Sequence, residues 1–430
     1  MRRIEIGLLG LGNVGSGVVR LLREHAEIVS ARLGAEVVLR RVAVRDPAKR
    51  RDVELDATLV TSDARDVLRD RDIRIVVELI GGIEPARTLV LEAIAAGKHV
   101  VTANKALLAE HGDEIFAAAE RAGVEVYFEA AVAGGIPIIR ALREGLASDR
   151  VEAIWGIVNG TSNYILTRMA DAGRPFDEVL REAQQAGYAE ADPTLDVEGV
   201  DAAHKLAILA TIAFGARLRP AQIFTRGVSV VEPADLAAAE RFGMCIKHLA
   251  IAKDHGDSLE VRVHPALVPK RWILASVGGA LNAVYVRSRA LGPSLYYGHG
   301  AGGLATAVAV VSDVIEVCRN LIAFSSSAPP PRSYRRLRDL PIRDMGDLEC
   351  RYYLRLAVAD QPGVLARVAG ALAAHGISIA EVVQGSAAAG PVSLIILTHR
   401  ARERDVQAAR AEIDAMEAAL GRTKLLRIEE

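Results

Sequence analysis

The sequence predicts an α/β protein with three parts: a Rossmann-type doubly wound nucleotide unit, an α+β unit, and a ferredoxin-like βαββαβ unit. Three observations support this class. Strands and helices alternate over the first 128 residues, longer helices mixed with strands follow, and a βαββαβ order fills residues 350–430. Alternation of strands and helices is typical of a parallel sheet covered on both faces. At 430 residues the chain is long enough for two or three separate cores.

The composition excludes several classes of protein. With 53 basic and 54 acidic residues the formal charge is −1, so no surface for nucleic acid or for an anionic membrane is expected. The N-terminus runs directly into a strand without an apolar signal region, and we expect a soluble cytoplasmic protein. The cysteines Cys245, Cys318 and Cys350 are widely spaced without a metal-ligand pattern, so we expect them to be reduced and structural.

The first expected unit, residues 1–128, begins with a nucleotide-binding fingerprint. A strand over 4–9 leads into Gly10, Leu11, Gly12, Asn13, Val14 and Gly15, and a helix is expected over 16–24. In this context Gly10 permits the tight turn, Gly12 lets a pyrophosphate approach the backbone, and Gly15 lets the helix pack on the strand. The alternative is that the glycines serve only a βα turn. Further strands are expected over 37–44, 74–80, 99–102 and 124–128, with a helix over 86–96.

The end of the second expected strand indicates the cofactor. The strand runs into Arg45 and Asp46, with Lys49, Arg50 and Arg51 close behind. An arginine at this position is suited to hold a 2′-phosphate, which favours NADP, whereas Asp46 keeps NAD possible. A solvated basic turn is the alternative.

The second expected unit covers residues 129–301, with strands over 154–158, 227–231 and 259–263 among longer helices. A helix over 305–323 is expected to return onto the first unit, so we assign 302–323 to it. Residues 324–349 are expected to be a linker, because Ser325–Pro331 is rich in serine and proline.

The last expected unit, 350–430, has strands over 352–359, 377–384, 392–398 and 424–428 and helices over 364–375 and 402–420. Its turn Asp360-Gln361-Pro362-Gly363, with Gly376-Ile377-Ser378-Ile379 after the helix, resembles the ACT family of amino-acid-sensing domains. In that family the turn helps to form an effector site between two such domains. A role in association alone is the alternative.

An acid-rich run carries the strongest signal for chemistry. Residues 192–205 hold four acids and end at Lys205, directly before the apolar stretch 206–210. Asp201 and Lys205 are four residues apart and therefore share a helix face. An exposed ion pair worth about 0.2–0.5 kcal/mol is the ordinary interpretation of such a spacing. The apolar helix and the nucleotide fingerprint argue for a functional pair.

The whole chain resembles the homoserine dehydrogenase family, in its long type with a C-terminal ACT domain. The resemblance implies interconversion of L-aspartate 4-semialdehyde and L-homoserine with NADP or NAD, within threonine, methionine and isoleucine biosynthesis. It rests on seven motifs in one order: 10–15, 77–82, 101–108, 129–137, 159–165, 187–193 and 196–205. One loop departs from the pattern, since 298–306 lacks both prolines that the family usually carries. We expect this loop to be looser, which puts Gly302 and Gly303 in doubt as nicotinamide contacts; His299 is interpreted as a solvated side chain.

The reduction of an aldehyde needs a hydride from the cofactor and a proton for the oxygen. An ammonium supplies the proton and stabilises developing charge if its pKa is tuned toward the working pH. Lys205 fits this role, with Asp201 orienting it or relaying the proton. Lys105 follows a strand at its carboxyl end, where open α/β sheets bind ligands, so we expect it near the nicotinamide and the substrate carbonyl.

The resemblance implies the remaining sites. It places Gly187, Glu190 and Asp196 at the substrate, whereas Asp192 is expected to order the Pro193 turn. Thr161 and Ser162 either bind the substrate carboxylate or cap a helix. The resemblance also implies a monovalent cation, most simply Na+, held by Glu129 and the carbonyls of Val132, Gly134 and Ile136; hard oxygen ligands suit such an ion. A glycine-rich turn is the alternative.

Two rival functions and one regulatory expectation remain. An aspartate-semialdehyde dehydrogenase would acylate a cysteine, and a non-catalytic regulator would need neither lysine. We expect a homodimer or homotetramer inhibited by an amino acid, with threonine favoured as the effector. A chain ending near Ser327 is expected to keep activity and lose inhibition.

Overall fold

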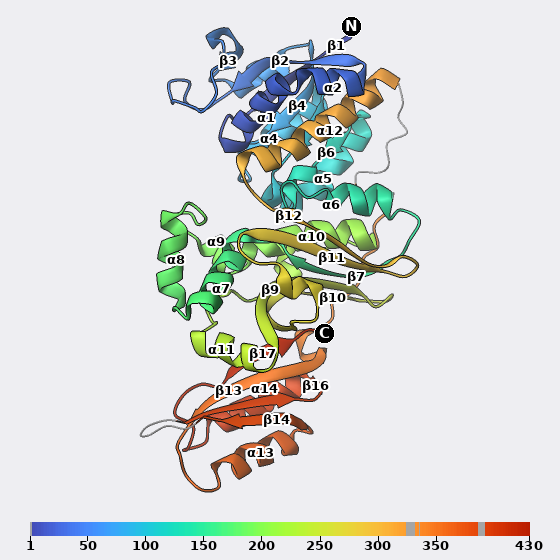
Figure 1. Ribbon diagram of the computed structural model, residues 1–430. Helices are drawn as coiled ribbons and strands as arrows, with labels where there is room; N and C mark the ends of the chain where they lie inside the picture. The colour runs from blue at the N-terminus through green and yellow to red at the C-terminus, as the bar shows by residue number, and fades with distance from the viewer. Residues whose placement is uncertain (1, 324–331, 335, 386–391) are drawn as a thin grey trace.

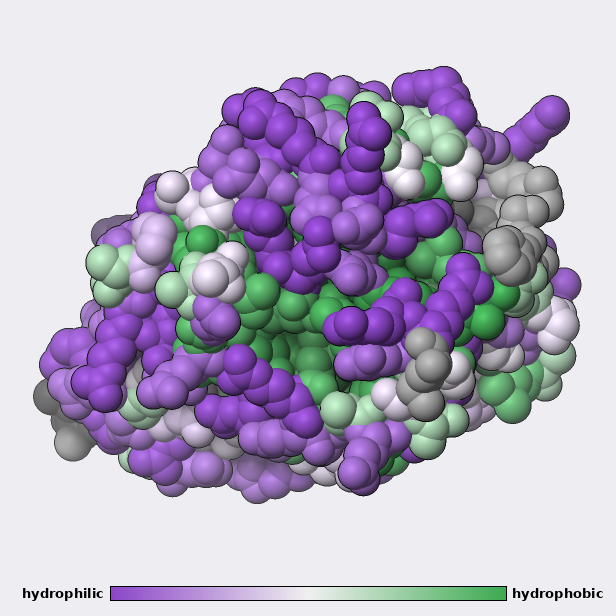
Figure 2. Space-filling model, turned by 90° about the horizontal axis from the view of Figure 1, so that it is seen from above, coloured by the Kyte–Doolittle hydropathy of each residue, from purple (hydrophilic) through white to green (hydrophobic). Residues whose placement is uncertain are grey.

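The computed structural model describes residues 2–323, 332–334, 336–385 and 392–430, and it arranges them in three tiers (Figure 1). The expected linker stretch Ser325–Pro331 lies outside the described residues. Within the described part of the chain, no helix is long and apolar enough to cross a membrane. Seen from the end that carries the first tier, the surface is hollowed, with a hydrophobic floor and a hydrophilic rim (Figure 2).

The first tier contains a six-stranded parallel sheet in the order β3-β2-β1-β4-β5-β6. The strand order reverses between β1 and β4, and a doubly wound sheet binds its ligand in the crevice at such a point. This confirms the predicted fold class. The strands are β1 Arg2–Leu9, β2 Ala35–Ala43, β3 Val60–Thr61, β4 Ile73–Glu78, β5 His99–Thr102 and β6 Val126–Tyr127.

Helices cover both faces of this sheet (Figure 1). One of them comes from far along the chain, because α12 packs against α1, as predicted. The contact is close: a Cβ on Gly17 would lie 2.6 Å from the carbonyl oxygen of Gly303. The helices are α1 Asn13–Glu24, α2 Ala26–Leu33, α3 Ala64–Arg69, α4 Ala86–Ala95, α5 Lys105–Ala122 and α12 Gly303–Ala323.

The central tier contains one part of a large sheet and the helix α10, which is buried along almost its whole length. The α10 helix packs against α5 of the first tier, and this contact joins the two tiers. The strands are β7 Val151–Ile157, β8 Phe224–Thr225, β9 Met244–Asp254, β10 Leu259–Pro269, β11 Leu281–Ser288 and β12 Gly292–His299. The helices are α6 Ile138–Arg140, α7 Gly160–Ala172, α8 Phe176–Gln185, α9 Thr194–Val197, α10 Val200–Phe214 and α11 Pro233–Arg241.

The strand predicted over 227–231 is wrong. This segment forms a turn that packs on the end of α9. The Val228 N–H donates to the carbonyl of Val197 at 2.8 Å instead of to a sheet. A Cβ on Gly227 would lie 2.4 Å from that same carbonyl, so the close approach depends on glycine.

The third tier has the predicted ferredoxin-like form, with strands in the order β17-β13-β15-β14. Its second helix ends earlier than predicted, since residues 418–420 pair with the end of β13: Leu420 N–H donates to Ala357 at 2.8 Å. The elements are β13 Glu349–Val358, α13 Val364–Ala374, β14 Ile379–Gln384, β15 Val392–Thr398, β16 Ala401–Arg402, α14 Glu403–Asp414 and β17 Lys424–Ile428.

The second and third tiers share one sheet. Strand β17 runs parallel to β10, with Ala266 opposite Arg427 and Leu267 opposite Ile428. Part of the expected linker also packs on the central tier, since the Arg338 N–H donates to the Gly215 carbonyl at 2.7 Å. The C-terminal unit is therefore joined to the central tier by strand pairing as well as by the connecting segment.

Candidate active site

The fingerprint turn has the geometry that the sequence predicts for nucleotide binding. Gly10 has a φ of +99°, and its N–H donates to the Ala43 carbonyl at 2.9 Å, which ties the turn to β2. A Cβ on Gly15 would lie 2.4 Å from the Gly10 carbonyl, so only glycine permits this packing. Among the described atoms none lies within 4 Å of a Cβ built on Gly12, which leaves room for a phosphate before α1.

The tip beyond β2 presents positive charge to the same edge of the sheet. Arg45 is exposed two residues after β2 ends. The Asp46 carboxylate accepts the Ala48 N–H at 2.9 Å, which orders the turn. Arg51 donates to the carbonyl oxygens of Lys49 and Asp46, so it is held by the backbone. Arg45 thus lies exposed at this tip, whereas Arg51 is engaged by the backbone.

Two polar residues that sequence analysis left without a role fix the loops after β4 and β5. Glu78 is fully buried and accepts from Ile80 N–H at 2.7 Å and Thr102 Oγ1 at 2.6 Å. Asn104 caps α5 through Leu107 N–H at 3.1 Å and donates to the Gly82 carbonyl. A short polar residue before a helix is a recognisable cap signal. Together these bonds set the position from which Lys105 leaves the sheet.

The centre of the site is a buried carboxylate between two lysines. Asp201 Oδ1 lies 3.0 Å from Lys105 Nζ and Asp201 Oδ2 lies 2.7 Å from Lys205 Nζ. Lys205 Nζ also donates to the Val158 carbonyl at 2.7 Å. The Lys205 side chain is 11% exposed and that of Lys105 is 42% exposed, so Lys105 faces solvent. The structure therefore brings together all three residues predicted to be catalytic.

The charges of this cluster stabilise one another. Burial alone would raise the pKa of Asp201, but Lys205 and Lys105 outweigh it and hold the pKa well below its usual range. Asp201 raises the pKa of Lys105, against the opposing effect of burial. Lys105 is a persistent cation beside a persistent carboxylate.

Asn159, another residue to which the sequence assigned no role, connects this centre to the expected substrate loop. Its Nδ2 donates to Asp201 Oδ2 at 2.8 Å and to Asp196 Oδ1 at 2.7 Å. Asn159 also caps α7 through Ser162 N–H at 2.8 Å, so the cap is neither Thr161 nor Ser162. Those two hydroxyls hold the loop instead: Thr161 bonds Asp196 Oδ2 at 3.2 Å and Ser162 bonds the Asp196 carbonyl at 2.9 Å.

The other predicted substrate residues lie around the same opening. Glu190 is exposed and helps to raise the pKa of Lys105, which places its charge near that ammonium. Gly187 has a φ of +78° just after α8 ends. Asp192 accepts from Thr194 N–H and Oγ1 at 3.1 and 2.6 Å, which confirms its predicted turn role.

The loop at 298–303 is packed more closely than its missing prolines suggested. A Cβ on Gly303 would lie 2.7 Å from the Asn13 carbonyl, next to the fingerprint. A Cβ on Gly300 would collide with the buried amide of Asn282, so glycine is required there. The side-chain oxygen and nitrogen of Asn282 have no hydrogen-bond partner among the described residues. His299 is exposed, as interpreted.

The candidate cation site contains one carboxylate, Glu129, which is buried. Glu129 accepts from the N–H groups of Ile139 and Arg140, each at 2.8 Å. Burial raises the pKa of Glu129, and those two backbone donors oppose the shift. The Ile136 carbonyl accepts from Ile138 N–H at 2.8 Å. An oxygen has two lone pairs, so these bonds are compatible with an ion, but they also give Glu129 a structural task.

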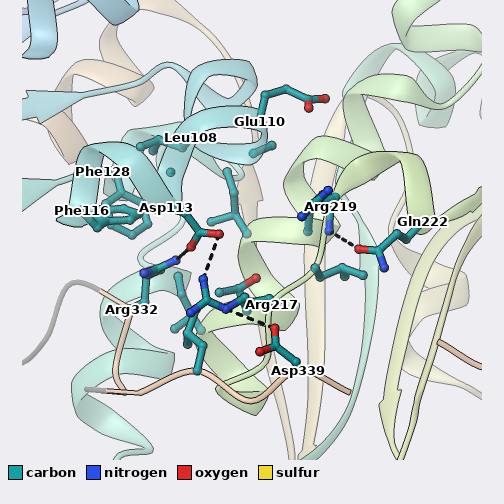
Figure 3. A pocket seen from close by; sticks show the side chains of 18 of the residues that line it. Leu108, Glu110, Asp113, Phe116, Phe128, Arg217, Arg219, Gln222, Arg332 and Asp339 are labelled. Atoms are coloured by element: carbon teal, nitrogen blue, oxygen red, sulfur yellow. Dashed lines mark hydrogen bonds and ion pairs between the residues drawn. The ribbon is translucent and has the colours of Figure 1, made fainter. Parts of the chain in front are cut away.

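A separate cavity of about 340 Å³ lies between α5, α10 and the residues Arg332, Leu337, Asp339 and Leu340 (Figure 3). Leu108 and Ile208 line it, about one helical turn beyond Lys105 and Lys205 on their respective helices. Asp113, which also lines the cavity, forms ion pairs with Arg217 and Arg332. Neither Lys105 nor Lys205 lines this cavity, so it is separate from the charged centre.

The cysteines do not support acyl-enzyme chemistry. Cys245, Cys318 and Cys350 are free, as predicted. Burial raises the pKa of Cys318 to about 12 and that of Cys350 to about 11, and it also raises the pKa of Cys245. A nucleophilic cysteine needs a lowered pKa. The rival aspartate-semialdehyde dehydrogenase hypothesis therefore has no candidate nucleophile.

Three protein families match successive parts of the chain. The NAD-binding domain of homoserine dehydrogenase matches residues 10–129, the homoserine dehydrogenase family matches 137–315, and the ACT domain matches 352–418. Homoserine dehydrogenase of Pseudomonas aeruginosa is 46% identical over the full length of both chains. That of Bacillus subtilis is 40% identical over 94% of this chain and 93% of its own.

Solved structures agree along the whole chain. A homoserine dehydrogenase from Thiobacillus denitrificans has a TM-score of 0.93 and 49% identity, covering 100% of this chain and 99% of its own. The Staphylococcus aureus enzyme at pH 7.5 has a TM-score of 0.79 and 31% identity, with 100% and 99% coverage. A hyperthermophilic archaeal homoserine dehydrogenase in complex with NADPH has a TM-score of 0.62 and 25% identity, covering 73% of this chain and 97% of its own.

Proposed function

The chain belongs to the homoserine dehydrogenase family, an oxidoreductase family with a nucleotide-binding domain, and from that premise we propose how its residues divide the reaction. The reaction interconverts L-homoserine and L-aspartate 4-semialdehyde. The observation that carries the proposal is the buried Asp201 carboxylate held between Lys105 and Lys205 where the first and central tiers meet.

Lys205 acts as the proton donor and acceptor at the substrate oxygen, and Asp201 orients it. Lys205 uses two of its three donors on Asp201 and Val158, which fixes the ammonium and leaves one N–H for a substrate oxygen. Lys105 adds a second fixed positive charge at the cleft, where it stabilises charge that develops on that oxygen. The hydride comes from the nicotinamide cofactor when it is bound.

The substrate amino group meets carboxylates on the opposite side of the opening. Asp196 is held by Asn159 and Thr161, and Glu190 is exposed toward Lys105. Gly187 lets the chain turn between α8 and this loop. The segment 187–196 therefore recognises the amino acid part of the substrate, and Thr161 contributes by holding Asp196.

NADP is the preferred cofactor and NAD is a weaker one. Residues 10–15 receive the pyrophosphate and Arg45 the 2′-phosphate, because Asp46 is already engaged in its own turn. A family member solved with NADPH supports this preference. Gly303 lies against the start of the fingerprint helix, and a Cβ on the adjoining Gly302 would meet open space, so we assign both glycines to the nicotinamide side of the crevice.

A monovalent cation, Na+, binds at Glu129 with the carbonyls of Val132, Gly134 and Ile136. The donors are hard oxygens around a buried carboxylate, which suits such an ion. The test is a thermal melt of the enzyme in tetramethylammonium chloride, to which NaCl or further tetramethylammonium chloride is added. A melting temperature that rises equally with both salts would remove the cation from the proposal.

The ACT domain responds to an amino acid, threonine, at the turn 360–363. Gly363 has a φ of +85°, and a Cβ there would meet open space, so a side chain would occupy the ligand's place. We expect Gly363→Val to abolish inhibition, with Gly243→Val as the matched control, because Gly243 also has a positive φ, of +68°, with open space at its Cβ, and lies outside the ACT domain. This variant is a cleaner test than a chain ending near Ser327, which would also remove β17 from the shared sheet.

Assembly and location complete the proposal. The enzyme forms homodimers or homotetramers, supported by the exposed Tyr297 and Leu291 at the edge strand β12 and its turn. Sedimentation of a single monomeric species at assay concentration would contradict this. The free cysteines suit a reducing cytoplasm, which fractionation of cells would test.

One assay tests the function as a whole. The purified chain should oxidise NADPH when L-aspartate 4-semialdehyde is added, and added threonine should slow the reaction. Absence of turnover with either NADPH or NADH would leave the regulator hypothesis standing. The same assay with lysine, methionine and isoleucine decides whether threonine is the effector.

A further inference from the structure

A second cleft, of about 490 Å³, lies between the central tier and the ACT domain. One wall is the β8 strand and the loop after it, and the other is the first part of α14. Phe224 and Met345 supply apolar surface, and one acid, Glu403, lines the cleft. Four arginines line it: Arg226, Arg404, Arg410 and Arg427.

Three of these arginines are already paired. Arg427 is held by Glu403, with Nε to Oε2 at 2.8 Å and Nη2 to Oε1 at 2.5 Å. Arg410 lies 3.7 Å from Asp414, and Arg404 contacts Asp347.

Arg226 is different. Its side chain is half-buried and has no carboxylate partner among the residues that the structure describes. Burial lowers the pKa of Arg226 most, Arg427 and Arg410 lower it further, and the Glu403 carboxylate opposes them from its own pair with Arg427. An arginine nevertheless keeps its charge in proteins. The cleft thus presents at least one guanidinium that an anion would satisfy.

We propose that this cleft binds a small phosphorylated molecule. Guanidinium groups match the oxygens of a phosphate in pairs, and several of them around one cleft favour a multiply charged anion. Phe224 and Met345 would pack against the organic part of the ligand. The cleft is distinct from the ACT turn at 360–363, because it is lined by α14 and not by α13.

The loop that carries Arg226 also contacts the segment 197–198, which follows Asp196 in the chain. The Arg226 carbonyl accepts from Nε2 of the buried His248 at 3.1 Å. Further along the loop, Val228 N–H donates to the Val197 carbonyl at 2.8 Å and Ser229 bonds Glu198 at 2.7 Å. Residues 197–199 stand between Asp196 and the start of α10, which carries Asp201. An anion that binds the Arg226 side chain would therefore shift this loop, and through residues 197–199 it would change the positions of Asp196 and Asp201.

The direct test is calorimetric titration of the full chain with pyrophosphate. Saturating NADP+ keeps the nucleotide fingerprint occupied, and KCl keeps ionic strength constant. We expect Arg226→Gln to weaken pyrophosphate binding by about 10- to 100-fold, because it removes a charge-assisted contact. Arg410→Gln should weaken it too. Arg402→Gln, an exposed arginine on β16 outside the cleft, should bind as the wild type does.

Equal pyrophosphate affinity in the wild type and in Arg226→Gln would overturn the proposal. Equal affinity for pyrophosphate and succinate would overturn its choice of a phosphate. A second readout is the KM for aspartate semialdehyde, which rests on the proposed function and should change with pyrophosphate by about 5- to 150-fold. Basal turnover of Arg226→Gln should persist, since only backbone atoms of Arg226 contact His248 and Val263. If the wild type shows no turnover of aspartate semialdehyde even without pyrophosphate, that result counts against the proposed function and not against the phosphate site.

Discussion

A buried ionic cluster lies at each of the two junctions between tiers. The two clusters differ in their exposure to solvent and in the hydrogen-bond donors that remain free. At the first junction Asp201 lies between Lys105 and Lys205. At the second, Arg262 lies between Glu260 and Glu429, beside the strand pairing that joins β10 to β17. In each cluster a buried charged group lies between two groups of opposite charge, so the burial and pairing of that central group do not tell a reaction site from a structural contact.

The difference lies in exposure and in spare hydrogen-bonding capacity. Arg262 is 0% exposed and reaches Glu260, Glu429 and His264. Trp155 Nε1 adds a donor to Glu429 at 3.2 Å. Lys105, in contrast, is 42% exposed and lies just beyond the carboxyl end of the parallel strand β5. A cluster with a charge turned outward is suited to act on a ligand, whereas a closed one holds two domains together.

The largest expected effect tests the first cluster. Lys205→Ala should lower kcat by at least about 10²-fold with the Kd for NADPH nearly unchanged, because general acid catalysis contributes about 10²–10⁴-fold. Steady-state kinetics and a fluorescence titration of NADPH measure the two quantities.

A matched control is available on β9. Lys247 is also buried, and its Nζ donates to the Val277 carbonyl at 2.7 Å. It is not part of the cluster formed by Lys105, Asp201 and Lys205. Lys247→Ala should keep most of the turnover. If both variants turn over like the wild type, Lys205 belongs with the structural pairs and the comparison fails.

The next effect tests the second cluster. Arg262→Leu leaves Glu260 and Glu429 buried without their main cation, and removal of one partner of a buried pair costs about 3–5 kcal/mol. Urea unfolding should show this loss, while kcat of the folded fraction stays near the wild-type value. Arg287→Leu, an exposed arginine 52% open to solvent, is the control. A large fall in kcat with unchanged stability would mean that the junction takes part in catalysis.

Local patterns predicted the elements of both junctions but not their contacts. The alternating strands, the fingerprint and the βαββαβ order gave the fold class, and the spacing of Asp201 and Lys205 gave their bond. The bond from Lys105 to Asp201 depends on how α5 packs on α10, far along the chain, which no local pattern encodes. The shared sheet is hidden for the same reason, because only two residue pairs join β10 to β17. The strand predicted over 227–231 failed because a tertiary contact of Gly227 outweighs β propensity.

A smaller effect comes from a charge outside both clusters. Arg45 is exposed, so its removal should change neither stability nor kcat. Arg45→Ala should weaken NADPH binding by about 1.5–3 kcal/mol, the range for a contact to a charged group, and leave NADH binding nearly unchanged. Binding titrations with both cofactors measure this difference. If the two cofactors weaken equally, the discrimination belongs to Lys49 or Arg50.

The last prediction tests the second cluster by its response to pH. Burial would raise the pKa of Glu429 and of Glu260, but Arg262 and Lys253 outweigh it and lower both pKa values to about 2. An unfolded glutamate has a pKa of about 4.3. A depressed pKa gives stability that is present above the unfolded value and lost as the pH falls toward the folded value. The free energy of unfolding should therefore fall between pH 4.3 and 2, by at most about 1.4 kcal/mol per pH unit for each carboxylate.

Glu429→Gln removes one titrating group and should flatten this slope, whereas Glu412→Gln, a half-exposed carboxylate beside His375, should not. Equal acid slopes in the wild type and in Glu429→Gln would show that this junction does not depend on its ion pairs.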